Sequence, residues 1–175
     1  GIAHIKAGRS LRESSWDRTG GNRDFRVVAP GETFVMADIE GAGRIEHLWI
    51  TTRCYSEKYL RKLVIEMFWD GEDNPSVRAP LGDFFGVGHA VAKHYVSLPI
   101  ACVFGPRRGP KGPFAAAMNM FFPMPFGSGA RIQLRNESDM PIENLFYYVD
   151  YALTETPIPD DVGRFHAYYR QERPT

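Results

Sequence analysis

One segment, SSWDRTGGNRDF from Ser14 to Phe25, carries the side chains best suited to binding a ligand. Arg18 and Arg23 present planar guanidinium groups whose N–H groups match a carboxylate or several sugar hydroxyls. Trp16 adds a flat apolar face of the kind on which a sugar ring stacks. Gly21 lacks a side chain, so the backbone can approach a ligand closely there. These groups suit recognition of a carboxylate or a sugar.

The same segment has a purely structural interpretation. Asp17, followed closely by two glycines and Asn22, suits a turn with positive φ values. An ion pair between Asp17 and an arginine of the segment would tether this turn to itself. From the residues alone both interpretations stay open. The binding hypothesis assigns Trp16, Asp17, Arg18, Gly21 and Asn22 to the ligand.

Two further carboxylate positions are candidates. Asp83 lies among glycines and aromatic residues in PLGDFFGVGH, where a carboxylate requires hydrogen-bond partners. It is either a structural residue or a further ligand contact. The acidic turn WDGEDNPS has enough oxygen ligands for calcium but lacks the spacing of a calcium-binding loop. A structural hairpin is the favoured interpretation of that turn, and no metal site is predicted.

The chain contains no self-sufficient catalytic set. Its five histidines show no metal-binding spacing, and no serine lies in a GxSxG motif. His47 is expected to be a core histidine on a strand face shared with Ile45 and Trp49. Cys54 and Cys102 lack the spacing of a zinc site and are expected to be buried as apolar residues. We therefore predict no catalytic residue and no cofactor.

Composition limits the partners. The 175 residues suit one domain, and 21 basic residues balance 21 acidic ones. A net charge of zero argues against nucleic-acid binding and permits self-association. No apolar run is long enough for a membrane span. Since no signal segment is recognisable, a cytoplasmic location is expected, or export if a signal was removed before Gly1.

Alternating apolar and polar residues predict strands along most of the chain. In NLFYYVDYAL, for example, Leu145, Tyr147 and Val149 share one face. GRIEHLWITT, KLVIEMFWDGE and ARIQLRN alternate in the same way. Gly, Pro, Asn and Asp separate about eight short strands, and the one expected helix is short, from Ser56 to Leu63. This pattern predicts an all-β, antiparallel jelly-roll sandwich.

The predicted organisation is a single jelly-roll domain, residues 1–175. Residues 1–24 form a leading segment that contains the SSWDRTGGN loop, 25–153 form the core strands, and 154–175 form a tail. The aromatic content of 13% exceeds what one small core needs. We therefore expect the domain to contact another domain or subunit.

Five motifs, in this order, resemble glycoside hydrolase family 172. They are SSWDRTGGNRDF, GAGRIEHLWIT, LVIEMFWDGEDNPSVRAPLGDFFGVG, FFPMPFGSGARIQLRNE and LFYYVDY…FHAYYR. The resemblance implies two jelly rolls, assembly into trimers or higher multiples, and action on α-linked fructofuranose or arabinofuranose units at subunit contacts. It also implies that the loop from Trp16 to Asn22 reaches a substrate pocket of a neighbouring subunit.

The resemblance breaks at the catalytic residues. The family's two catalytic glutamates lie in a Trp-Gly-Glu-Gly-Asp and a Gly-Thr-Glu-Asp-Tyr-Phe motif, and neither string occurs here. A retaining glycosidase needs two carboxyl groups about 5–5.5 Å apart. Glu66 and Glu72 do not match these residues. The tail is then expected to point toward a second jelly roll that these 175 residues do not include.

Two functions remain. In the first, the chain is the N-terminal domain or subunit of a glycoside hydrolase and contributes sugar-binding residues. The catalytic glutamates then lie elsewhere, on a partner chain that carries the second jelly roll or in a part lost by truncation. In the second, the chain is a non-catalytic jelly roll that binds carbohydrate or assembles with copies of itself.

Overall fold

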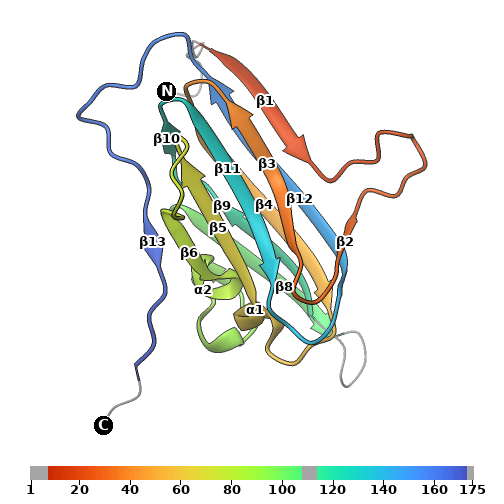
Figure 1. Ribbon diagram of the computed structural model, residues 1–175. Coiled ribbons are helices and arrows are strands. Elements are labelled where there is room, and N and C mark those ends of the chain that lie inside the picture. The colour runs from red at the N-terminus through yellow and green to blue at the C-terminus, as the bar shows by residue number, and fades with distance from the viewer. Residues whose placement is uncertain (1–7, 108–113, 173–175) are drawn as a thin grey trace.

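The computed structural model describes residues 8–107 and 114–172, and two sheets packed face to face make up most of this part (Figure 1). The larger sheet contains, in spatial order, β1 (Arg9–Ser14), β12 (Ile142–Leu153), β4 (Gly43–Cys54), β9 (Phe114–Met120), β8 (Ile100–Arg107) and β7 (Tyr95–Val96), with β2 (Arg26–Val28) paired to β12 and β10 (Met124–Phe126) paired to β4. The smaller sheet contains β13 (Ala167–Tyr168), β6 (Val77–Pro80), β5 (Leu63–Trp69), β11 (Gly129–Asn136) and β3 (Thr33–Glu40). The predicted all-β sandwich is confirmed.

The chain passes repeatedly from one sheet to the other, as in a jelly roll. It goes from β3 to β4 to β5, for instance, and later from β11 to β12. The described residues contain thirteen strands rather than about eight, four of them only two or three residues long. All strand pairs are antiparallel except β13 with β6, which is parallel.

The part of the chain that the structure describes contains two short α-helices, where at most one was expected. α1 (Tyr59–Lys62) lies inside the predicted helical segment. α2 (Leu81–Phe84) was not expected, because its residues directly continue the apolar pattern of β6. The chain turns directly after Pro80, and Gly82 lets α2 pack against α1, since a Cβ there would lie 3.0 Å from Cβ of Leu60. A 3-10 turn, η1 (Gly88–Ala90), follows.

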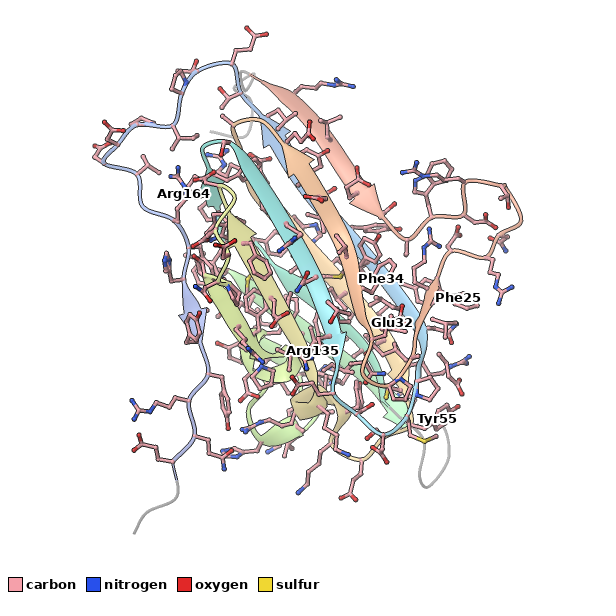
Figure 2. All side chains as sticks on the ribbon, viewed as in Figure 1. Phe25, Glu32, Phe34, Tyr55, Arg135 and Arg164 are labelled. Atoms are coloured by element: carbon pink, nitrogen blue, oxygen red, sulfur yellow. The ribbon has the colours of Figure 1, made fainter. Side chains whose placement is uncertain are left out.

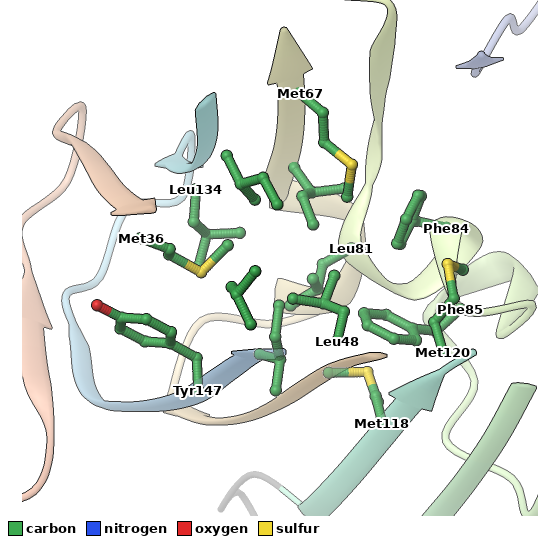
Figure 3. Close-up of a cluster of buried hydrophobic side chains, with 14 of the residues drawn as sticks. Met36, Leu48, Met67, Leu81, Phe84, Phe85, Met118, Met120, Leu134 and Tyr147 are labelled. Atoms are coloured by element: carbon green, nitrogen blue, oxygen red, sulfur yellow. The ribbon is translucent and has the colours of Figure 1, made fainter. Parts of the chain in front are cut away.

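The core fills the space between the two sheets, with Met36, Leu48, Met67, Met118, Leu134 and Tyr147 among its side chains (Figure 3). Leu145, Tyr147 and Val149 face this core from β12, as the alternation predicted. Cys54 and Cys102 are also buried as expected. Burial raises the pKa of the Cys102 thiol to about 11.

The expected core position of His47 is wrong. Asp150 pairs with His47 whereas the next residue of β12, Tyr151, pairs with Ile45, so Glu46 forms a bulge in β4. A bulge reverses the inward and outward alternation beyond it. Ile45 is therefore fully buried, while His47 and Trp49 lie on the outer face of the larger sheet.

The segment after β12 runs along the edge of the smaller sheet (Figure 1). We call residues 154–172 the tail. β13 pairs with β6, and Nε1 of Trp69 donates to the carbonyl of Phe165 at 2.7 Å. The first seven residues of the predicted leading segment and the last three of the predicted tail lie outside the described residues. Among the helices of the described part, none is both long and apolar enough to cross a membrane.

Candidate functional site: a projecting loop on the larger sheet

Residues 15–25 form a loop that projects from the sandwich between β1 and β2, with Phe25 at its base (Figure 2). We call it the 15–25 loop. Its centre is Asp17, whose Oδ1 accepts hydrogen bonds from the backbone N–H of Thr19 at 2.9 Å and from the Thr19 hydroxyl at 2.6 Å. Oδ2 accepts from the backbone N–H of Arg23 at 3.1 Å. A second carboxylate adds to this closure, since Oδ1 of Asp24 accepts from the backbone N–H of Asp17 at 2.7 Å.

These hydrogen bonds explain the electrostatics of Asp17. The Thr19 hydroxyl, followed by the N–H groups of Thr19 and Arg23, lowers the pKa of Asp17 below its ordinary value. The carboxylate therefore stays ionised near neutral pH. Gly21 and Asn22 shape the turn: a Cβ at Gly21 would lie 2.9 Å from Oδ2 of Asp17, and Asn22 has a φ of 56°.

The two interpretations of this segment are thus partly reconciled. Asp17 tethers the loop, but through backbone N–H groups rather than through an arginine side chain. Trp16 remains 52% exposed. The Arg18 guanidinium lies 5.8 Å from the centre of the Trp16 ring and makes only a loose ion pair with Glu13, at 4.0 Å. Trp16 and Arg18 are therefore available to a ligand or partner.

The base of the loop is fastened to the larger sheet by residues that the sequence analysis did not select. Arg26 donates from its guanidinium to the carbonyls of Ser15, Phe25 and Trp16 at 3.0, 3.2 and 3.3 Å. Ser15 exchanges hydrogen bonds with the backbone of Tyr147, at 3.2 and 3.1 Å. Both ends of the loop are therefore held, and its tip is presented in a defined position.

A row of polar side chains crosses four strands on the outer face of the larger sheet. Arg12 donates to both oxygens of Asp150, at 2.5 and 3.0 Å. His47 contacts Asp150 through Nδ1 at 2.9 Å and Asn119 through Nε2 at 3.2 Å. Partial burial opposes ionisation of Asp150, but hydrogen bonds from Arg12 and His47 outweigh it and lower its pKa.

Aromatic rings line the same face. Trp49 stacks on Tyr148 with ring centres 4.7 Å apart, and Arg12 lies 4.2 Å from the centre of the Tyr148 ring. Phe25 contacts Phe146 at 5.8 Å, which joins this face to the loop. Because these neighbours lie against the Tyr148 ring, it is less suited than Trp16 to stacking on a sugar. The outward alternation of β12 was the only sequence signal for this row.

Asp83 lies apart from the loop. It belongs to α2, at the lower left in Figure 1, whereas the loop is at the right. Oδ2 of Asp83 is 2.8 Å from Nε of Arg61, but the N–H is not directed at the oxygen, so the contact is an ion pair rather than a hydrogen bond. Burial raises the pKa of Asp83, with Arg61 opposing. Within one chain Asp83 does not join Trp16 and Arg18.

The acidic turn WDGEDNPS has a structural role, in agreement with the interpretation as a hairpin that the sequence favoured. Asp70 accepts N–H groups of Gly127, Ser128 and Gly129, and Glu72 accepts from the backbone N–H of Trp69 at 2.8 Å. No group of His, Cys, Asp or Glu in the described residues could hold a metal ion. The candidate site is therefore the 15–25 loop together with the polar and aromatic sheet face next to it.

Comparison with known proteins gives one finding. The model of a family described as GH172 domain-like matches residues 22–147, more than two thirds of the chain. The match includes Asn22 and Asp83 but begins after Trp16, Asp17, Arg18 and Gly21. No curated protein matches the sequence.

Proposed function

The chain belongs to the GH172 domain-like family, and from this premise we propose that it is the sugar-binding β-sandwich of a glycoside hydrolase that acts on α-linked furanosides. The observation that carries the proposal is the 15–25 loop, held rigid around Asp17 with Trp16 and Arg18 exposed at its surface. A stacking ring beside a guanidinium suits a sugar that presents both a C–H face and hydroxyls.

The proposal assigns binding, not bond cleavage, to this chain. Hydrolysis with retention needs a carboxylate nucleophile and a protonated carboxylic acid about 5–5.5 Å from it. The pKa values of Asp17 and Asp150 are both lowered by their hydrogen bonds, which makes them unsuitable as the acid. The two glutamate motifs expected from the resemblance do not occur in these 175 residues. The catalytic carboxylates are therefore supplied from elsewhere. Hydrolysis then passes through an oxocarbenium-like transition state.

The partners follow from this division of roles. We expect either a homo-oligomer, a trimer or a multiple of it, or a partner chain with a second jelly roll. Asp83 lies away from the loop of its own chain. We therefore propose it as a sugar contact only where an interface brings it next to the loop of another subunit. The non-catalytic alternative, a carbohydrate-binding or assembling module, shares the same loop and differs in having no partner that supplies carboxylates.

Replacing Trp16 by alanine tests the binding role. We expect affinity for an α-arabinofuranosyl or α-fructofuranosyl oligosaccharide, measured by calorimetry, to fall roughly tenfold to a hundredfold, as for an exposed aromatic anchor. Tyr55→Ala is the matched control, because Tyr55 is 42% exposed and lies outside the loop. Unchanged affinity in Trp16→Ala, or an equal loss in Tyr55→Ala, would exclude the loop as the sugar site.

A further inference from the structure

The outer face of the larger sheet presents an aromatic ring to which the proposed function gives no role. Phe121, directly after β9, is 51% exposed and stacks on His47, with ring centres 4.6 Å apart and ring planes 11° apart. Because His47 covers one side of the Phe121 ring, the exposed side faces solvent. A ring fixed in this way can stack on the C–H face of a sugar with little further loss of side-chain freedom.

The polar row beside this ring is fixed in place, yet it keeps free hydrogen-bonding capacity. An ionised carboxylate offers about four acceptor positions, and Asp150 uses three of them for Arg12 and His47. Arg12 is half exposed and directs two of its five N–H donors at Asp150. Asn119 donates one N–H of its amide to the carbonyl of Ala101 at 3.3 Å, which leaves the other. The row therefore retains donors and an acceptor for the hydroxyl groups of a ligand.

The mixture of rings and charged groups favours a sugar over a protein as the occupant of this face. The core of a protein interface is depleted of charged residues, whereas here the ion pair of Arg12 and Asp150 lies next to the Tyr148 ring. A carbohydrate presents C–H faces and hydroxyl groups side by side, which matches such a surface. Since Arg12 and Asp150 balance each other's charge, a neutral glycan suits the face better than an acidic one.

The length of the polar row exceeds that of one sugar ring. Its residues belong to β1, β12, β4 and β9, which are consecutive in the sheet. Adjacent strands lie about 4.8 Å apart, so these four strands span about 14 Å. The face also adjoins the base of the 15–25 loop, where Phe25 contacts Phe146. A ligand that follows the row is therefore a chain of several sugar units.

We infer that the outer face of the larger sheet is a second carbohydrate-binding surface, which holds an extended neutral oligosaccharide. Phe121 stacks on one sugar unit, and the polar row binds the hydroxyl groups of the neighbouring units. The inference rests on the proposed function and deepens it, because it identifies the surface for units beyond the one at Trp16. Units bound on the face add affinity to the contact at the loop, since one chain links the two.

An NMR titration with sugars of two lengths tests the inference. The probes are an α-arabinofuranosyl disaccharide and the corresponding hexasaccharide, each added to the ¹⁵N-labelled protein. Trp49 pairs with Asn119 between β4 and β9, so the Trp49 indole and the side-chain amide of Asn119 report on the face. The Trp16 indole reports on the loop. We expect the disaccharide to shift the Trp16 signal alone and the hexasaccharide to shift all three signals.

Replacing Phe121 by alanine distinguishes the two surfaces by affinity. Calorimetry should show a roughly tenfold loss of affinity for the hexasaccharide, because one stacking ring is removed. Affinity for the disaccharide, which binds at the loop, should not change. Tyr168→Ala is the matched control, because Tyr168 is 66% exposed but belongs to the smaller sheet. This control should leave both affinities unchanged.

The outcomes separate this inference from the proposed function. Saturable shifts of Trp16 with both sugars, while Trp49 and Asn119 stay in place, would overturn the inference and leave the loop as the sugar site. Shifts of Trp49 and Asn119 without Trp16 would support the face and exclude the loop. An equal loss of affinity for both sugars in Phe121→Ala would also overturn the inference. The absence of any shift with either sugar would overturn both proposals.

Discussion

Replacing Asp70 by alanine is expected to destabilise the sandwich more than any other single carboxylate change. Oδ1 of Asp70 accepts the N–H groups of Gly127 and Ser128 at 2.7 Å each and that of Gly129 at 3.3 Å. Oδ2 accepts from Nε of Arg164 at 2.6 Å. One side chain therefore joins the turn after β5, the turn before β11 and the tail, where Figure 2 shows Arg164.

We expect a loss of about 3 kcal/mol in the free energy of unfolding, since several charge-assisted hydrogen bonds disappear and N–H groups lose their acceptor. For a domain of this size that lowers the melting temperature by roughly 6–12 °C. Thermal unfolding followed by circular dichroism measures it. Asp73→Ala, an exposed residue in the same turn, is the control and should change stability little. Equal effects from both changes would contradict the assigned role.

The same carboxylate predicts a pH dependence. Burial opposes ionisation of Asp70, but the N–H groups and Arg164 outweigh it and hold its pKa below the ordinary 3.8. As the pH falls, Asp70 therefore becomes protonated in the unfolded chain before it does in the folded protein. Its contribution to the free energy of unfolding is complete above about pH 4–5 and is lost as the pH falls through the pKa of Asp70 in the folded state. The difference in stability between the wild type and Asp70→Asn should be constant near neutrality and should narrow below about pH 4.

Replacing Asp17 by alanine should abolish the order of the 15–25 loop without unfolding the sandwich. The N–H groups of Thr19 and Arg23 lose their acceptor, so their amide hydrogens should exchange with solvent much faster. If ligand recognition depends on the ordered loop, sugar affinity should fall roughly tenfold, because the loop must be ordered during binding. The melting temperature should change little, since the loop is exposed.

Asp17→Asn is the matched variant. Its amide oxygen can still accept from Thr19, so it should retain part of the affinity and part of the protection against exchange. Sugar binding that is intact in Asp17→Ala, together with fast exchange at Thr19 and Arg23, would show that loop order is irrelevant to recognition. Slow exchange in that variant would contradict the role of Asp17 as the centre of the loop.

The parts of the fold that local patterns determine could be predicted. Alternation along β12 correctly assigned Leu145 and Val149 to the core, because β12 keeps its period of two from Leu145 to Tyr151, beyond the register shift between Ile142 and Asn144. The orientation of His47 could not be obtained in this way. The bulge at Glu46 depends on the register of β4 against β12, a contact between segments about a hundred residues apart.

In the candidate site, too, residue types indicated some features, whereas others depend on the conformation and on the order of the strands. The residue types of the loop indicated binding, and Trp16 and Arg18 are indeed exposed. That Asp17 closes the loop through backbone N–H groups is a matter of conformation, which residue types do not determine. The pair Arg12 and Asp150 lies 138 residues apart. Such a contact follows from sheet order, and no spacing in the sequence reveals it.

The most direct measurement is an NMR titration of the ¹⁵N-labelled protein with an α-arabinofuranosyl oligosaccharide. The chain has three tryptophans. The Trp69 indole is bonded to a backbone carbonyl and Trp49 stacks on Tyr148, whereas Trp16 is exposed. Sugar binding at the loop predicts that the Trp16 indole signal and the amides of residues 17–22 shift in a saturable way while Trp69 stays in place. No shift at any sugar concentration, or shifts confined to other surfaces, would contradict the account.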